Sequence, residues 1–226
     1  MKALLLLLPL LASPTGNVSS QLQHPWGRWQ PGAWAQIRTQ SPRMPDGLVE
    51  RHQLVGFDER GYVLESTLLI EGGDVETQMH QSWGETGFAH VLPGAQRTGT
   101  EAVELGGRRI SCEVWQGSWQ EKRETMVGTS WIAPGYDFPL RWRMAAPSGS
   151  LELRLVDRND FVRVDGRKLP AWRYEGRAQA PSGNLTLVSW MSLDVPGGLV
   201  RQEAKSPDGL VVRQLEEFRS TPRRRR

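Results

Sequence analysis

The sequence is poor in the residues that carry most enzyme chemistry. It has one cysteine and four histidines, so no internal disulfide can form, and no pair of histidines has the spacing of a zinc motif. No segment matches a nucleophile elbow, a phosphate-binding glycine loop or a dinucleotide-binding fingerprint. We therefore expect no enzyme activity, no catalytic residue, no cofactor and no metal site. His52 and His80 alternate with apolar neighbours, as ordinary surface or half-buried strand residues do.

Long apolar runs are also scarce. Residues 3–12 form an apolar stretch that follows Met1-Lys2, has the length of a secretion signal and is too short to span a bilayer. We predict a signal peptide over residues 1–20 and an exported protein that is periplasmic or extracellular. No later run is long enough for a transmembrane segment.

An excess of one charge is missing from the body of the chain. The formal net charge is +3, and residues 223–226 are four arginines, which leaves −1 for the rest. Nucleic-acid binding needs a basic face rather than a basic end, so we expect no nucleic-acid partner. Residues 221–226 are predicted to form a solvated basic tail.

Short alternating segments separated by turn residues make up most of the remaining chain. Between residues 33 and 83, four such segments are separated by turn sequences that include Asp46-Gly47 and Gly72-Gly73. They predict a β meander over residues 21–102, in which residues 67–70 are the most apolar and form a central strand. The fold class is mainly all-β, with antiparallel meander sheets and an open or half barrel as one arrangement of them.

The C-terminal half contains a tandem repeat. A shift of 59 positions places residues 103–161 on residues 162–220 without a gap, with 11 identities that include Arg154 on Arg213. We predict two β repeat units with these bounds, in one sheet or two, and one compact domain over residues 21–220. Trp131 and Trp190 fall at the same place in the two units and are expected to pack in the core.

Two further segments need an interpretation. Cys112 alternates with Ile110 and Val114, which predicts a buried small hydrophobic residue rather than a reactive thiol. The acidic segment at residues 157–160 lacks the glycine and distal glutamate of a calcium loop, so it is predicted to be an ordinary turn between the units.

Tryptophan is unusually frequent, with ten in the chain. Trp26, Trp29 and Trp34 lie close together among prolines and glycines, which excludes a helix interior. They predict an aromatic plug that closes one end of the core or, as the alternative, an exposed ligand-binding surface that stacks on sugars.

Short motifs carry a resemblance. Trp29-Gln-Pro-Gly-Ala-Trp34 and the Val195-Pro-Gly-Gly198 element resemble a set of uncharacterised exported bacterial β-repeat proteins. In pattern only, the chain is similar to the periplasmic lipoprotein carriers of the LolA and LolB type. That resemblance implies a curved antiparallel sheet that forms an open barrel around lipid, although this sequence has no evident helices to plug such a barrel.

Export, β architecture and missing catalytic motifs favour a non-enzymatic envelope protein with a binding or scaffold role. Its expected partner is a hydrophobic ligand such as a carried lipid, a cell-envelope polymer or an envelope protein. One alternative is an exported hydrolase whose acidic and histidine residues meet only in three dimensions, and another is a carbohydrate-binding protein that uses Trp26, Trp29 and Trp34. An open apolar cavity would favour the carrier, and a filled interior the scaffold.

Overall fold

Antiparallel strands account for the regular structure of the chain. The computed structural model describes residues 25–57, 61–70, 73–82, 95–121, 124–136, 138–181 and 183–222. Thirteen strands form one sheet. They are β1 (Trp34–Ser41), β2 (Met44–Phe57), β3 (Gly61–Leu69), β4 (Val75–Ser82), β5 (Gln96–Leu105), β6 (Arg108–Glu121), β7 (Glu124–Ile132), β8 (Arg141–Ala146), β9 (Gly149–Val164), β10 (Arg167–Ala180), β11 (Gly183–Met191), β12 (Leu199–Ser206) and β13 (Gly209–Arg219).

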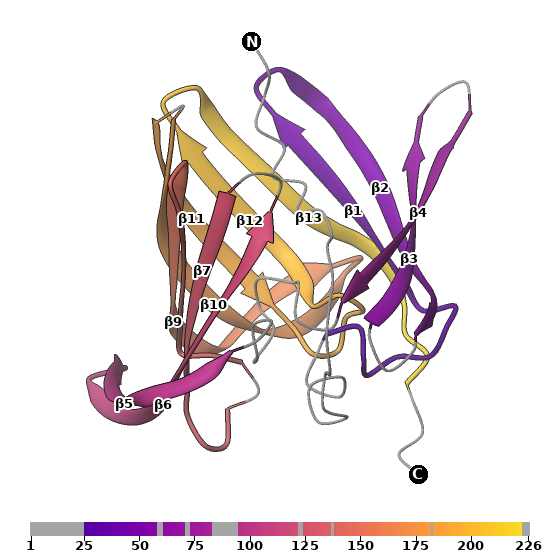
Figure 1. The fold of residues 1–226 in the computed structure, drawn as a ribbon. Helices are drawn as coiled ribbons and strands as arrows, with labels where there is room; N and C mark the ends of the chain where they lie inside the picture. The colour runs from indigo at the N-terminus through magenta and orange to yellow at the C-terminus, as the bar shows by residue number, and fades with distance from the viewer. Residues whose placement is uncertain are drawn as a thin grey trace.

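Strands that follow one another in sequence pair with one another, except for β4 and β5. The order across the sheet is β4-β3-β2-β1-β13-β12-β11-β10-β9-β8-β7-β6-β5, so β1 pairs with β13, and β4 and β5 are the edges. The sheet curls until β1–β4 face β7–β11, and it does not close (Figure 1). The predicted all-β meander with an open barrel is therefore confirmed, and it is one sheet rather than two.

The first hairpin reverses earlier than the sequence suggests. The Asp46-Gly47 pair predicts a turn, but β2 already begins at Met44 and the chain reverses at residues 42–43. Gly47 has a positive φ of 79° inside the strand, where a Cβ atom would lie 2.8 Å from the Gln40 side chain. The glycine thus allows an irregularity in the β1–β2 pairing and does not form the turn.

Two other sequence predictions assign the wrong structure to a segment. Residues 67–70 do not form a central strand, because β3 lies next to the edge strand β4 and Ile70, beyond its end, is 44% exposed. Residues 157–160 form no turn, since they lie inside the 16-residue strand β9. The β9–β10 register shifts at this point, so the polar residues mark a bulge that bends a long strand.

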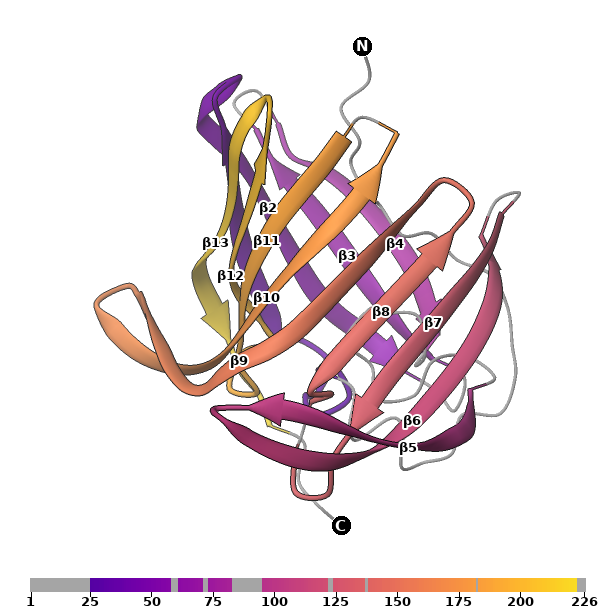
Figure 2. The ribbon, with the colours of Figure 1, turned by 90° about the vertical axis from the view of Figure 1, so that its left-hand side faces the viewer.

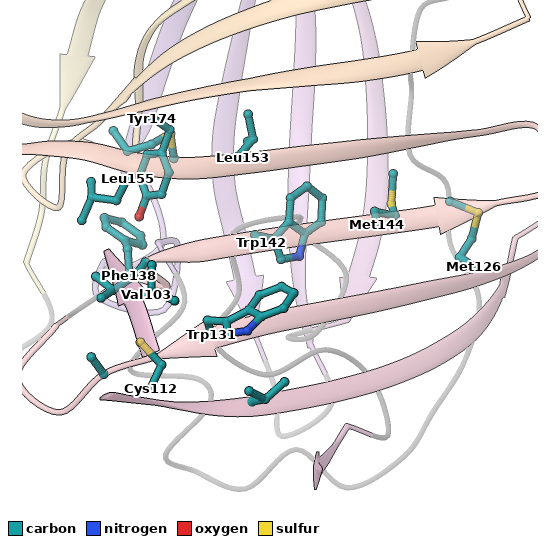
Figure 3. Close-up of a cluster of buried hydrophobic side chains, with 14 residues drawn as sticks. Val103, Cys112, Met126, Trp131, Phe138, Trp142, Met144, Leu153, Leu155 and Tyr174 are labelled. Atoms are coloured by element: carbon teal, nitrogen blue, oxygen red, sulfur yellow. The ribbon is translucent and has the colours of Figure 1, made fainter. Parts of the chain in front are cut away.

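The buried side chains form three clusters, and most of their members lie on the face toward which the sheet curls, called the inner face below. The largest includes Trp142 on β8, Leu153 on β9 and Tyr174 on β10, which lie on neighbouring strands (Figure 3). The Tyr174 hydroxyl donates a hydrogen bond of 2.8 Å to the carbonyl of Pro139 in the loop before β8. Cys112 belongs to this cluster and is 1% exposed, as predicted, and burial raises the pKa of its thiol.

Strand boundaries in the C-terminal half recur with the predicted spacing. β6 and β10 begin and end 59 residues apart, and so do β7 and β11. The contacts recur as well, because the Trp131 indole donates a hydrogen bond of 2.7 Å to Glu101, and that of Trp190 one of 2.9 Å to Asp160. The β5–β6 and β9–β10 hairpins extend at the same end of the sheet (Figure 2).

The gapless alignment of the two units is wrong beyond Trp190. The two Pro-x-Gly turns at residues 147–149 and 207–209 lie 60 residues apart, and the β11–β12 register shifts beside Trp190. A slip of one residue reverses the face that each side chain takes. Arg154 therefore points outward, whereas the aligned Arg213 points inward between core residues. The duplication itself and the domain bounds stay predictions.

Several predictions fall outside the described residues. These are the signal peptide over residues 1–20 and the arginines at 223–226. In the part of the chain that the structure describes, no helix has the length and apolar character needed to cross a membrane.

Candidate binding site on the inner face

Burial on the inner face falls from one end of the sheet to the other. At the packed end, inward side chains are fully covered, as Tyr174, Leu215 and Leu54 show with exposures of 0%, 1% and 0%. Toward the other end of the same strands, Ala178 and Met144 stay buried, but most of the inward residues are half-buried. They are Thr39, Leu48, Leu68, Ala146, Leu151, Leu185, Leu187, Ala204 and Val211. Among the described residues, the inward side chains are therefore covered at one end of the sheet, the packed end, and partly exposed at the other, the open end.

Two loops close the packed end. The β7–β8 loop contributes Phe138 and Leu140, and the β11–β12 loop contributes Val195, all at most 1% exposed. The Trp26 ring packs against the second loop, where a Cβ atom on Gly197 would lie 2.9 Å from it. Loops and the Trp26 ring thus close this end of the interior.

The tryptophans proposed for sugar binding lie in two environments. Trp26 and Trp29 are 6% and 7% exposed and belong to a cluster with Leu54 and Tyr62. Trp34 is half-buried on the outer face, and the Arg51 guanidinium lies 4.6 Å from the centre of its ring. The arrangement does not bring the three rings together as one exposed platform. Their role in carbohydrate binding stays an untested alternative.

A belt of polar side chains crosses the inner face between its packed and open ends. The polar belt consists of Glu50 and His52 on β2, Ser66 on β3, Ser189 on β11, Gln202 on β12 and Arg213 on β13. Cross-strand partners share a face, and the belt residues pair with one another or with core residues. His52 pairs with Ser66 and with the buried Ala35, and Gln202 pairs with Ser189 and Arg213.

His52 is the centre of contacts on the β2 side of the belt. Its Nδ1 atom lies 2.8 Å from the Ser66 hydroxyl oxygen, and its Nε2 atom lies 3.9 Å from the Glu50 carboxylate. The His52 and Glu50 side chains keep 22% and 28% of their surface exposed. A ligand in the open half of the interior can therefore reach both groups.

Arg213 supplies a positive charge on the β13 side. Burial lowers the pKa of His52 below its ordinary value of 6.5, the Glu50 carboxylate opposes this effect, and the Arg213 charge adds to it. Burial also lowers the pKa of the Arg213 guanidinium, again opposed by Glu50. The three groups therefore act on one another across β1. At neutral pH His52 is uncharged, and the belt holds one cation and one anion.

The remaining belt contact joins β11 and β12. The Gln202 amide donates a hydrogen bond of 3.1 Å to the hydroxyl of Ser189, which is 0% exposed. Ser130 lies 59 positions earlier and is also 0% exposed, but its hydroxyl has no hydrogen-bond partner among the described residues. Its cross-strand neighbour is Trp142 rather than a glutamine.

A hollow opens at the rim of the sheet, lined by residues of both faces. It measures about 530 Å³ and lies between the tips of the β10–β11 and β12–β13 hairpins. Ala178 and Leu185 bring inward side chains to it, and Arg177 and Lys205 bring charged side chains from the outer face. No group of three or more potential metal ligands occurs among the described residues.

The sequence did not identify the polar belt. His52 was interpreted as an ordinary strand residue, and Arg213 was aligned with an outward arginine. One sequence pattern could have indicated the site. Glu50 and His52 are polar residues at alternate positions of a strand face that also carries the apolar Leu48 and Leu54.

Comparison with known proteins gives distant structural similarity alone. A protein from Bacteroides fragilis, described as exported and as having a YmcC-like fold, shows 9% identity and a TM-score of 0.39, with 84% of this chain and 97% of that chain covered. A LolA superfamily protein from Nitrosomonas europaea shows 11% identity and a TM-score of 0.37, with 94% and 96% covered. No family model and no curated protein matches the chain. Similarity this low carries no argument about function, which has to come from the geometry.

Proposed function

We propose that the chain is a non-enzymatic exported protein that binds a hydrophobic ligand in the open half of its inner face. The observation that carries this proposal is the change in burial along single strands, from Leu215 at 1% exposure to the half-buried Val211 four residues earlier. Apolar side chains that stay partly uncovered around a concave surface favour a ligand that covers them. The apolar stretch at residues 3–12 supports export to the periplasm or the exterior.

The packed end argues against an interior that is open throughout. Two loops and the Trp26 ring fill that end, so a ligand enters from the rim and reaches only to the polar belt. An apolar chain fits the open half of such an interior, because its sides meet Leu187 and Val211. A carrier of this kind holds its ligand at one end of the sheet and uses the other end for stability.

Binding of a fluorescent fatty acid to the purified protein tests the proposal. Val211 and Leu210 are neighbours on opposite faces of β13, the first inward and half-buried, the second 44% exposed on the outer face. We expect Val211→Glu to weaken binding at least about tenfold, about 1.4 kcal/mol, and Leu210→Glu to change it less than about twofold. Absence of binding to the unaltered protein, together with absence of lipid in its organic extract, would overturn the proposal.

An exported hydrolase is the second candidate, favoured by one observation. Ser66, His52 and Glu50 bring a hydroxyl, an imidazole and a carboxylate together on the open part of the inner face, in the residue types of a nucleophile, a base and an orienting group. The uncharged state of His52 at neutral pH suits a base. Hydrolysis of a p-nitrophenyl ester of an aliphatic acid that disappears in Ser66→Ala would support this candidate. Equal rates in the two proteins would remove it.

A further inference from the structure

The polar belt interrupts an inner face that is otherwise lined by apolar side chains. Inward residues are apolar on both sides of it along the same strands, with Leu48 and Leu54 flanking Glu50 and His52 on β2. Half-buried charges cost free energy unless they are paired. A ligand with an apolar chain alone would remove water from Glu50 and Arg213 and offer them no hydrogen bond in return. The belt therefore indicates that the ligand has a polar part at this depth.

The charges of the belt oppose one another. Glu50 carries the negative charge and Arg213 the positive charge, and each acts on the His52 ring. The pairings with β1 place Glu50 at a level between those of His52 and Arg213. The outward charges near these strands, such as Arg201 and its partner Glu203, lie on the other face of the sheet. The net charge that the belt presents to the interior is zero at neutral pH.

A charged ligand head would gain little in this field. Two unit charges 4 Å apart at an effective dielectric constant of 20 interact by about 4 kcal/mol. An anionic head attracted by Arg213 is also repelled by Glu50, and a cationic head attracted by Glu50 is also repelled by Arg213. The cost of removing the head from water would then remain uncompensated.

A neutral head with hydroxyl or ester groups avoids this cost. Donors are available to it on Arg213 and Gln202, and acceptors on the Glu50 carboxylate and the Gln202 amide oxygen. Hydrogen bonds to charged groups are the stronger ones, and a hydroxyl can donate to Glu50 and accept from Arg213 at once. The belt thus offers hydrogen-bond donors and acceptors to a ligand that carries no charge.

We propose that the polar belt selects single-chain amphiphiles with an uncharged, hydroxyl-bearing head, of which a monoacylglycerol is the simplest, over anionic and cationic amphiphiles of the same chain. This inference rests on the proposed function, because it places the apolar chain in the open half of the inner face. It adds the chemical class of the head and assigns its recognition to Glu50 and Arg213.

Competition against a bound fluorescent fatty acid tests the selection. Monomyristoylglycerol, myristate and tetradecylamine share one chain length and differ in the charge of the head. We expect monomyristoylglycerol to bind at least about tenfold more tightly than the other two, a difference of about 1.4 kcal/mol.

Single substitutions in the belt should then shift the preference in opposite directions. Glu50→Gln leaves the belt positive and should improve myristate relative to monomyristoylglycerol by about tenfold, and Arg213→Gln should improve tetradecylamine by a similar factor. Glu203→Gln is the matched control, because Glu203 also faces an arginine, Arg201 at 2.7 Å, but on the outer face. It should leave the order of the three amphiphiles unchanged.

The outcomes separate this inference from the proposed function. If none of the amphiphiles displaces the probe and the probe itself does not bind, the proposed function fails. The inference alone fails if all three amphiphiles bind with equal strength, or if neither belt variant shifts the preference beyond the Glu203→Gln control. The interior would then bind apolar chains without distinguishing their head groups. Either belt variant suffices for the test should the other not fold.

Discussion

Strands β6–β9 and strands β10–β13 place different side chains at matching inward positions. Allowing for the one-residue slip beyond Trp190, five inward positions of the first set correspond to five of the second. The pairs are Trp142 and Gln202, Met144 and Ala204, Leu151 and Val211, Leu153 and Arg213, and Leu155 and Leu215. Four of the five are smaller or more polar in β10–β13. The first set fills the interior, and the second leaves space and supplies the polar belt.

The comparison teaches that side-chain volume and polarity on one face decide what a curled sheet does. The backbone pairings of the two sets are similar, and both contain an inward serine with no exposure, Ser130 and Ser189. Large apolar residues around Ser130 give a core, whereas Gln202 and Arg213 near Ser189 give a half-open polar surface. A small number of exchanges on one face therefore separates a scaffold from a binding surface.

The largest effect is expected where the polar residue of one set replaces the apolar residue of the other. Leu153→Arg would bury a guanidinium at a position that is 2% exposed, with no inward carboxylate on the neighbouring strands. We expect a loss of about 4–5 kcal/mol in the free energy of unfolding, measured by urea denaturation. The reverse exchange, Arg213→Leu together with Glu50→Gln, should cost about 1 kcal/mol or less. Comparable losses for both exchanges would break the comparison.

A smaller but still large difference is expected at the neighbouring pair. Trp142→Gln should lose about 3–5 kcal/mol of unfolding free energy, because Trp142 is 3% exposed and its removal leaves a cavity among large neighbours. Gln202→Ala should lose about 1 kcal/mol, the worth of its hydrogen bond to Ser189. Urea denaturation of both variants checks the difference, and a cost below 2 kcal/mol for Trp142→Gln would show that this end of the interior is not tightly packed.

The equivalent tryptophans should respond alike. Trp131→Phe and Trp190→Phe each remove an indole donor from a carboxylate, that of Glu101 and that of Asp160. We expect each to cost about 1–2 kcal/mol of unfolding free energy, since both hydrogen bonds go to charged groups at partly exposed sites. Trp34→Phe is the control, because the Trp34 ring stacks under Arg51 and phenylalanine keeps part of that stacking. An effect at one site alone would weaken the case for a duplicated unit.

The smallest effect concerns pH and belongs to the belt alone. The folded-state pKa of His52 lies below 6.5, so the unfolded chain takes up a proton first as the pH falls. Stability that is fully present above pH 6.5 should decline as the pH drops from 6.5 through the folded-state pKa. His52→Asn should remove this part of the decline, measured as unfolding free energy against pH. An unchanged slope in the variant would place the proton uptake elsewhere.

The fold class followed from the sequence because alternation is a local property of each strand. The sequence predictions were wrong where the conformation of a segment depends on the strand that it pairs with. Gly47 looked like a turn residue but lies in an irregular pairing, and the residues at 157–160 form a bulge because β9 is long enough to bend. The slip beside Trp190 is invisible in a gapless alignment, because one extra loop residue changes no single motif.

The polar belt could not be predicted from spacing. Its residues lie on five strands, and Glu50 approaches Arg213 only because β1 pairs with β13. That pairing depends on the whole sheet rather than on any segment. His52 alone offered a local indication, an i and i+2 polar pair with Glu50 on a face that is otherwise apolar.

The pairing of β1 with β13 also has a consequence for how the protein folds. Inside the sheet, a strand made early in synthesis pairs with the strand made last, as the register of Ile37 opposite Leu215 shows. Hairpins on either side can form from local sequence, but their union requires closure of a loop that spans nearly all of the described chain. Until β13 is complete, β1 exposes an unpaired edge whose inward Ala35 and Ile37 have no covering strand. A circular permutant that joins the two strands by a short linker and opens the chain between β4 and β5 should therefore fold faster while keeping the same sheet.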